Sequence, residues 1–257
     1  MKTWPYPKLF AHRGGGSLAP ENTLAAMKKG RELGYYAVEF DVKLSGDDTA
    51  MLMHDATLAR TTNGVGEVKN QTYDQLALLD AGSWHSPAYR DERIPKLTEV
   101  AHYLQANGMT ANVEIKPCAG RESETGKRVA ELCSELWRDR FVKPIISSFS
   151  FSALQAAFAA EPALPYGLLV KTPTEEHIKQ LAEIHCVSLH CRHMETSSDA
   201  VDFFHAKGYK VLTYTVNEQQ RARELESWGV DGIFTDNLAL MAQAFPAWLT
   251  GEQQAAS

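Results

Sequence analysis

The stretch Val38-Glu39-Phe40-Asp41-Val42 decides how the rest of the sequence is interpreted. Its branched and aromatic residues are typical of a β-strand. Because successive side chains on a strand point to opposite faces, Glu39 and Asp41 share one face and the apolar residues share the other. Burying two unpaired carboxylates costs several kcal/mol each, so either the pair lies on a solvated edge strand or a cation offsets the charge. A divalent cation held by oxygen ligands is the simplest such cation.

Length and composition favour one globular domain. A chain of 257 residues suits a single α/β barrel, and 44% hydrophobic residues are ordinary for a domain with a substantial core. The net charge of −6 argues against nucleic-acid binding and against general attraction to anionic membranes. An anionic small-molecule substrate remains compatible with this charge, because a bound cation and local Arg or Lys can dominate a pocket. We therefore expect one domain over residues 1–257, no nucleic-acid partner and no stable membrane association.

The N-terminal stretch 1–7 has no apolar signal core, and no later apolar run is long enough to span a bilayer. We therefore expect a soluble, cytoplasmic protein. The four cysteines show no compact disulfide framework, which favours free thiols in a reducing compartment. A zinc site among the histidines and cysteines of 185–193 is disfavoured, because their spacing matches no zinc pattern and 186–190 also has the composition of a buried strand.

Short apolar runs alternate with amphipathic segments along the chain. The expected strands are 8–12, 38–42, 111–116, 145–149, 166–170, 186–190, 210–216 and 232–236. Helices are expected at 24–33, 97–106, 123–138, 153–160, 174–184, 199–207 and 218–228, with a last helix after 236. Eight strand–helix units in one domain predict a TIM (β/α)8 barrel. An open doubly wound sheet is the alternative, but Gly14-Gly15-Gly16 lacks the spacing of its dinucleotide turn.

Residues 56–95 interrupt this alternation after the second strand. A run at 50–54 could first pair with 38–42 as a hairpin. The segment that follows is rich in Thr, Asn, Gly and Asp, with one short helical candidate at 73–79. It is too short and too polar to bury a large core, so we interpret it as a small insertion on the barrel rim rather than a second domain.

Chemically capable side chains gather at the expected C-terminal strand ends, where TIM barrels form their active sites. They are His12, Arg13, Glu39, Asp41, His54, Glu114 and Lys116. Each residue alone has an ordinary structural explanation, but together they make a poor apolar core and a good site. The three acids supply hard oxygen ligands for Mg²⁺ or Ca²⁺, and the Arg and Lys suit an anionic oxygen. With two histidines to transfer protons, this set describes hydrolysis of a phosphate ester.

Four motifs, in order and spacing, resemble the glycerophosphodiester phosphodiesterase family. They are His12-Arg13-Gly14 with Ala19-Pro20-Glu21-Asn22-Thr23, then Glu39-Phe40-Asp41-Val42, His54-Asp55, and Glu114-Ile115-Lys116-Pro117. Segments 214–217 and 229–236 match the C-terminal strands of the family, so the resemblance spans residues 8–236. Segments 4–7 and 80–84 are similar to the corresponding segments of the cytosolic bacterial member of this family.

The resemblance implies hydrolysis of glycerophosphodiesters, such as glycerophosphocholine or glycerophosphoethanolamine, to glycerol 3-phosphate and an alcohol. It also implies a divalent metal on Glu39, Asp41 and Glu114, and acid–base catalysis by His12 and His54. Either histidine can be the acid and the other the base. Attack by the glycerol hydroxyl of the substrate, through a cyclic phosphate, is one mechanism proposed for the family. Phe149 and Tyr214 either line the glycerol or head-group side of the pocket or pack at the barrel mouth. The family often has Trp at the position of Tyr214.

Two other functions are considered. A lysophospholipase D-type phosphodiesterase would need an apolar rim, and an insertion with Trp84 and Tyr89 is too sparse to supply one. A non-catalytic phosphodiester-binding barrel would not need the complete set of histidines. Head-group preference, the working ion and the oligomeric state are left open by the sequence.

Overall fold

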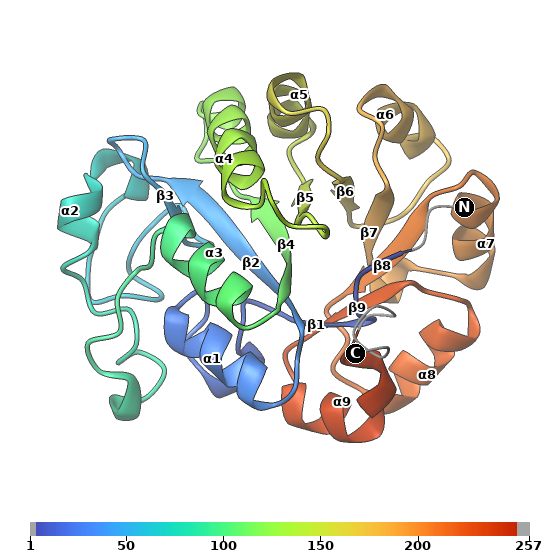
Figure 1. Ribbon diagram of the computed structural model, residues 1–257, viewed down its shortest axis with the longest axis horizontal. Helices are drawn as coiled ribbons and strands as arrows, with labels where there is room; N and C mark the ends of the chain where they lie inside the picture. Colours follow the sequence, from blue (N-terminus) through green and yellow to red (C-terminus); the bar gives the residue numbers. More distant parts are fainter. Residues whose placement is uncertain (1–3, 251–257) are drawn as a thin grey trace.

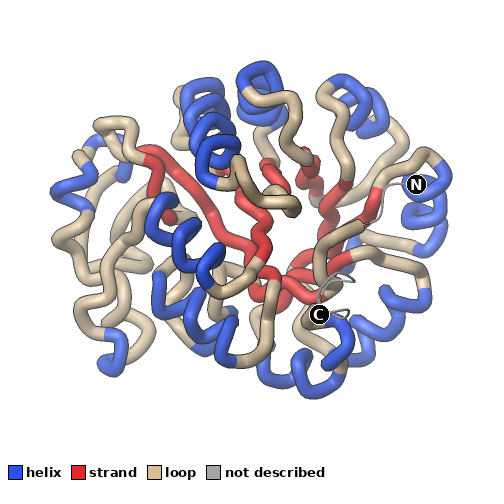
Figure 2. The backbone as a smooth tube through the Cα atoms, viewed as in Figure 1, coloured by secondary structure: helices blue, strands red, loops and turns tan. Residues whose placement is uncertain are grey.

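A closed barrel of parallel strands forms the centre of the computed structural model, which describes residues 4–250 (Figure 1, Figure 2). Neighbouring strands follow the order β1-β2-β4-β5-β6-β7-β8-β9, and β9 pairs with β1 to close the sheet. The strands are β1 (Leu9–Ala11), β2 (Ala37–Leu44), β4 (Thr110–Ile115), β5 (Ile145–Ser148), β6 (Tyr166–Val170), β7 (Ser188–Arg192), β8 (Lys210–Tyr214) and β9 (Gly232–Thr235). The closure confirms the predicted TIM (β/α)8 barrel, and the open-sheet alternative is wrong.

Helices surround the barrel on its outside (Figure 2). They are α1 (Leu24–Glu32), α3 (Leu97–Ala106), α4 (Glu122–Leu136), α5 (Phe151–Ala160), α6 (His177–Glu183), α7 (Ser198–Ala206), α8 (Gln219–Ser227) and α9 (Leu238–Ala244). Local signals set their ends. The Thr23 hydroxyl accepts the Ala26 N–H at 3.1 Å and caps α1, and Gly34, with φ of 87°, follows that helix in the left-handed conformation.

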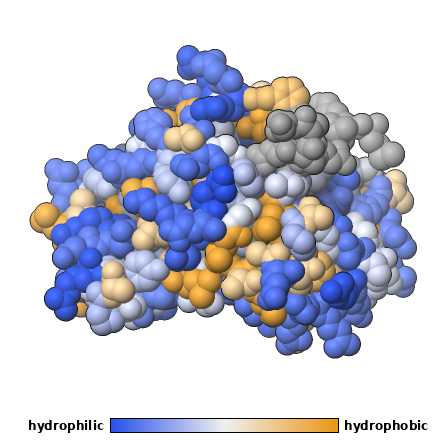
Figure 3. All heavy atoms as spheres, turned by 60° about the horizontal axis from the view of Figure 1, so that its bottom comes forward, coloured by the Kyte–Doolittle hydropathy of each residue, from blue (hydrophilic) through white to orange (hydrophobic). Residues whose placement is uncertain are grey.

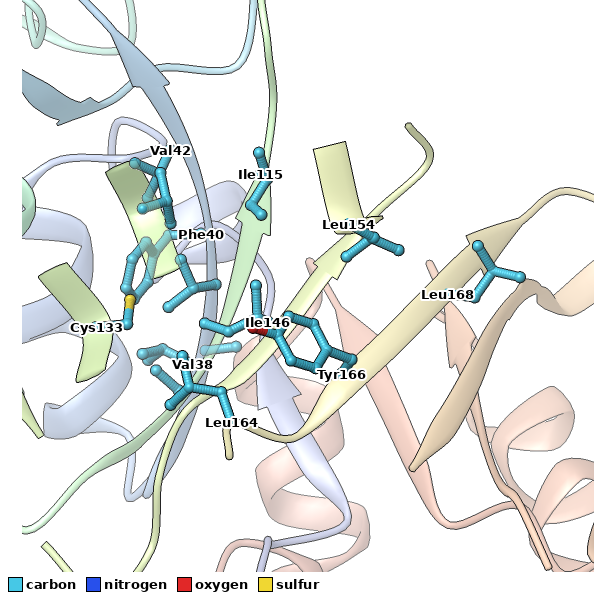
Figure 4. Packing of buried hydrophobic residues seen from close by; sticks show 14 of the residues in the cluster. Val38, Phe40, Val42, Ile115, Cys133, Ile146, Leu154, Leu164, Tyr166 and Leu168 are labelled. Atoms are coloured by element: carbon cyan, nitrogen blue, oxygen red, sulfur yellow. The ribbon is translucent and has the colours of Figure 1, made fainter. Parts of the chain in front are cut away.

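The main hydrophobic core lies between the outer faces of the strands and the helices. Val38, Phe40 and Val42 are fully buried in this core, together with side chains of the neighbouring strands and helices (Figure 4). Glu39 and Asp41 therefore lie on the inner face of the barrel, as strand alternation predicts. Hydrophilic residues cover most of the face shown in Figure 3, with hydrophobic residues gathered mainly near its middle.

Strand β7 differs from its predicted range of 186–190 and instead spans 188–192. The reason is that the Cys186 N–H still donates to the turn that ends α6, with an N···O distance of 2.9 Å. His190 consequently faces the barrel interior, whereas Cys191 packs in the outer core. Because these neighbours point to opposite faces, His190 and Cys191 cannot share one zinc ion.

The inserted segment lies beside β2, at one side of the barrel (Figure 1). The segment is preceded by β3 (Ala50–Leu52), which pairs antiparallel with β2 as the predicted hairpin, and it includes α2 (Tyr73–Leu76), shorter than predicted. A small separate hydrophobic cluster supports it, made of Met51, Met53, Leu58, Val68, Tyr73, Leu76, Ala81, Ile94 and Cys118. His85 and Tyr89 bind backbone carbonyls of the loop after β1, at 3.1 and 3.0 Å. These bonds make the insertion part of the barrel mouth.

Residues 1–3 and 251–257 lie outside the described range, and with them parts of the predicted N-terminal segment and of the predicted domain. Between residues 4 and 250, none of the helices combines the length and the apolar character needed to cross a bilayer. All four cysteines are free thiols, as predicted, and the structure shows that all four are buried.

A buried histidine lies inside the barrel, below the strand ends. The side chain of His190 is fully buried, and its Nε2 lies 2.9 Å from Ser188 Oγ. Burial lowers the pKa of His190 from the ordinary 6.5 to about 3. The folded protein therefore keeps this imidazole neutral at pH values where the unfolded chain protonates it.

We predict that His190 makes the protein less stable in acid. Since the unfolded state binds the extra proton, the free energy of unfolding falls as pH drops below 6.5, by about 2 kcal/mol at pH 5 from this residue alone. Denaturant unfolding of the wild type and of His190→Gln, each at pH 7 and pH 5, measures this loss of unfolding free energy. The variant should lose less stability between the two pH values, and equal losses would contradict the prediction.

Candidate active site

The turn after β1 brings two of the candidate residues to the barrel mouth. Arg13 adopts the left-handed backbone conformation with φ of 50°, and Gly14 follows at 87°, where an added Cβ would lie 2.7 Å from Met27 Sδ. This tight turn lets the Arg13 backbone N–H donate to Glu39 Oε2 at 2.9 Å. His12 and Arg13 are thus placed directly against the acids of β2.

The three predicted metal ligands form one cluster on the inner face of the barrel. Asp41 and Glu114 are register partners on the adjacent strands β2 and β4, and Glu39 lies two residues before Asp41. One carboxylate oxygen from each residue lies within 4.8 Å of the other two, and all three side chains are buried. Glu39 Oε1 has no hydrogen-bond partner among the described residues. A buried acceptor without a partner indicates a place where a ligand completes the site.

Two cations partly offset the acidic cluster. Lys116 Nζ lies 3.4 Å from Asp41 Oδ1 and also binds Glu114 Oε1. Arg13 Nε lies 3.4 Å from Asp41 Oδ2. Asn22, from the loop before α1, donates its amide N–H to Asp41 Oδ2 at 2.9 Å. The protein's own cations and hydrogen-bond donors therefore offset the negative charge of Asp41 more than that of Glu39 or Glu114.

The acid pKa values follow this uneven compensation. Burial first, and the negative charge of Asp41 second, raise the pKa of Glu39 to about 7 and that of Glu114 to about 8. Burial acts on Asp41 as well, but Lys116 and Arg13 outweigh it and hold the pKa of Asp41 at about 2. Three carboxylates beside two side-chain cations thus leave room for additional positive charge, which suits a divalent ion with oxygen ligands.

The two candidate catalytic histidines are each oriented by a carboxylate. His12 Nδ1 lies 2.6 Å from Asp236 Oδ1, and His54 Nδ1 lies 2.6 Å from Asp55 Oδ1. Because an ionised carboxylate only accepts hydrogen bonds, Nδ1 carries the proton in each ring and Nε2 is free for chemistry. Burial lowers the pKa of His54, whereas at His12 the Asp236 and Glu39 carboxylates overcome burial and raise the pKa.

A cavity of about 190 Å³ lies at the centre of these groups. Its lining includes eight of the nine predicted site residues, namely His12, Arg13, Glu39, His54, Glu114, Lys116, Phe149 and Tyr214, and the ninth, Asp41, is bonded beside it. Phe149 and Tyr214 pack edge to face with ring centroids 5.7 Å apart. The Tyr214 hydroxyl donates to Val170 O at 2.6 Å, so a ligand meets the ring of Tyr214 and not a free hydroxyl donor. The structure thus brings all nine residues together, and their roles remain predictions.

Several residues at the site were given no role by the sequence reasoning. They are Asp236 and Asp55 beside the histidines, and Glu21, Asn22 and Arg60 around Arg13 and Asp41. All but Arg60 lie inside motifs already visible in the sequence. An Asp next to His54, and an Asp ending the strand that closes against β1, were the available signals for the two histidine partners.

Comparison with known proteins places the chain in a family. A model of the Glycerophosphoryl diester phosphodiesterase family matches residues 12–240. The chain belongs to this family. A glycerophosphodiester phosphodiesterase of Caldanaerobacter subterraneus is 34% identical over 89% of this chain and 93% of its own length. One of Bacillus subtilis is 29% identical over 88% of this chain and 82% of its own. The resemblance drawn from the four motifs is thereby confirmed.

Solved structures agree with this assignment. An Oleispira antarctica phosphodiesterase in complex with the product sn-glycerol-3-phosphate superposes with a TM-score of 0.88 at 35% identity, covering 94% of this chain and 97% of that one. An Agrobacterium tumefaciens glycerophosphodiester phosphodiesterase has a TM-score of 0.79 at 26% identity, covering 92% and 99%. As a member of the glycerophosphoryl diester phosphodiesterase family, the chain is an enzyme that cleaves phosphodiesters of glycerol.

We predict that a divalent ion binds this site more tightly at higher pH. Glu39 and Glu114 have raised pKa values of about 7 and 8, so protons compete with the ion for both acids at low pH. Affinity for Ca²⁺ or Mg²⁺ should therefore rise between pH 6 and pH 8, with release of protons. Calorimetry in two buffers of different ionisation enthalpy measures both effects. The control is Glu122→Gln, which removes an acid from the groove next to the central cavity and should keep the same rise in affinity with pH. Equal affinity of the wild type at pH 6 and pH 8 would refute the prediction.

Proposed function

We propose that this enzyme hydrolyses glycerophosphodiesters such as glycerophosphocholine and glycerophosphoethanolamine to glycerol 3-phosphate and an alcohol, and that it requires Mg²⁺ or Ca²⁺. One observation carries the proposal: a cluster of three buried carboxylates lies between two histidines that are each held by an aspartate. The sn-glycerol-3-phosphate bound to the Oleispira antarctica relative supports this product.

The acidic cluster suits a divalent ion by chemistry and by an unsatisfied acceptor. Glu39, Asp41 and Glu114 would hold the ion, and the unpartnered Glu39 Oε1 is the atom that most needs it. When bound, such an ion neutralises charge on the phosphate and polarises its oxygens. The positive charge of a bound ion would also lower the raised pKa values of Glu39 and Glu114, because it stabilises the ionised carboxylates that hold it.

Arg13 and Lys116 are proposed to bind the phosphate. Both line the central cavity, and both hold positive charge next to Asp41. The planar guanidinium can bind two phosphate oxygens at once, whereas the ammonium acts as a point charge. Phe149 and Tyr214 form the aromatic wall of the same cavity, which we assign to the carbon chain of glycerol.

The two histidines are proposed to move the protons. The lowered pKa of His54 favours a neutral ring, so its Nε2 would accept the proton of the attacking hydroxyl, which comes from the substrate's own glycerol or from water. His12 would then donate a proton to the oxygen of the departing alcohol. If the glycerol hydroxyl attacks, the product of this step is a cyclic phosphate, which water would open in a second step to give glycerol 3-phosphate. Asp55 and Asp236 hold Nδ1 of each ring and fix its tautomer.

The cysteines support a cytoplasmic location. All four are free and buried in the described residues, and free thiols are the usual state in reducing compartments. We therefore infer that the enzyme works in the cytoplasm on small soluble phosphodiesters.

We predict that His12→Ala and His54→Ala each lose roughly 100-fold or more in kcat while remaining folded, because each removes a general acid or base. A matched control is His102→Ala, which truncates an exposed histidine on α3 and should keep full activity. Circular dichroism and thermal unfolding would verify the fold of each variant. Near-normal turnover by both site variants would overturn the assignment of roles.

We predict that chelation abolishes activity and that Mg²⁺ or Ca²⁺ restores it. A coupled assay for glycerol 3-phosphate, with the metal varied, should show release from several glycerophosphodiesters and little turnover of lysophosphatidylcholine. Full activity in excess chelator would rule out the metal requirement. Preference for lysophosphatidylcholine would favour the lysophospholipase D alternative, and binding without release of glycerol phosphate would favour a non-catalytic barrel.

A further inference from the structure

Arg60, in the inserted segment, binds two carboxylates at once. Its Nε and Nη2 donate to Asp55 Oδ2 and Oδ1 at 2.7 and 3.0 Å. Its Nη1 and Nη2 donate to Glu21 Oε2 and Oε1 at 2.6 and 2.7 Å. The whole donor edge of one guanidinium is therefore used to hold Asp55 and Glu21 in a fixed relation to each other.

Each of these carboxylates also holds a residue of the active site. Asp55 Oδ1 lies 2.6 Å from His54 Nδ1. Glu21 Oε1 accepts a hydrogen bond from Arg13 Nη1 at 2.7 Å, and Arg13 Nε lies 3.4 Å from Asp41 Oδ2. Arg60 thus stands at the centre of a continuous chain of contacts from His54 to Arg13.

We propose that Arg60 is a positioning residue that fixes His54 and Arg13 in one relative geometry. It does not line the central cavity, so it acts through Asp55 and Glu21 rather than on the substrate. The proposal rests on the proposed function, because it assigns the base to His54 and phosphate binding to Arg13. It makes the inserted segment a working part of the active site.

The physical reason is that a guanidinium can hold two carboxylates that would otherwise repel each other. Without Arg60, Asp55 would lose two of its hydrogen bonds and its hold on the His54 ring would loosen. Glu21 would be free to form a two-pronged pair with Arg13 and turn that guanidinium away from the phosphate. A loose base lowers kcat, and a displaced phosphate ligand raises KM.

A contribution to stability alone does not account for this arrangement. The Arg60 side chain is 43% exposed, so solvent screens its ion pairs in part, and a purely stabilising role would leave kcat and KM unchanged. Arg93, in the same segment, is 48% exposed, donates only to the Leu78 carbonyl and lies 3.9 Å from Asp91. Arg93 is therefore a matched control for the loss of an arginine from the inserted segment.

The test compares Arg60→Ala, Arg60→Lys and Arg93→Ala in the full-length enzyme loaded with metal, on glycerophosphocholine. Arg60→Ala should lower kcat about tenfold and raise KM, as is usual when a residue that orients a catalytic group is removed. Its melting temperature should match that of Arg93→Ala. Arg60→Lys should recover part of the loss, because an ammonium can bind one of the two carboxylates.

Double variants separate the contact of Arg60 with His54 through Asp55 from its contact with Arg13 through Glu21. In the Asp55→Asn background, Arg60→Ala should cause no further fall in kcat, and in the Glu21→Gln background it should cause no further rise in KM. Fully additive effects in both backgrounds would overturn the proposal. So would kcat and KM of Arg60→Ala equal to those of Arg93→Ala.

The outcomes also separate this proposal from the function on which it rests. Absence of phosphodiester hydrolysis in the wild type would refute the proposed function. An active wild type with an unaffected Arg60→Ala would refute the positioning role alone. If Arg60→Ala does not fold, Arg60→Lys carries the test, because wild-type kinetics in that variant would show that the two-carboxylate clamp is not needed.

Discussion

Three carboxylates within 4.8 Å of one another, inside a barrel, are the constraint to which the rest of the structure responds. Like charges this close cannot all stay ionised in a buried place without compensation. The surrounding side chains compensate the three negative charges to different extents. Lys116 and Arg13 keep Asp41 ionised, while Glu39 and Glu114 have pKa values raised to about 7 and 8. Such a cluster is unfavourable for folding by itself, and it makes sense as a place prepared for a cation.

The barrel geometry explains how sequence positions far apart come to serve one cluster. Neighbouring parallel strands put Asp41 and Glu114 in register, and closure of the sheet brings Asp236 against His12 across 224 positions of sequence. Each surrounding group then holds the next one. The orientation of the histidines depends on their aspartates, and that of Asp55 depends in turn on Arg60. The inserted segment, which adds little to the main core, belongs to the site through this last contact.

Much of this site could be predicted from sequence because strand periodicity is a local property. The two-residue spacing of Glu39 and Asp41 was enough to place both on one face of β2, and the same spacing places Glu114 and Lys116, the residue just after β4, on one side of the chain. The start of β7 was misplaced because a hydrogen bond from Cys186 extends the turn after α6, which no periodicity reveals. The role of Arg60 depends on partners from two other loops, and a polar segment without a repeating pattern gives no indication of them.

Hydrogen-bond satisfaction distinguishes the acids that support the site from the one most clearly prepared for a ligand. Asp55 is saturated by Arg60 and His54, and Glu21 by Arg60 and Arg13. Glu39 Oε1, by contrast, is buried without a partner among residues 4–250. A buried acceptor left unpaired costs free energy in the folded protein, so its persistence in a site whose supporting carboxylates are well paired points to an occupant supplied from outside the chain. Carboxylates of one chemical type thus take different roles, and their hydrogen-bond partners decide which role each one takes.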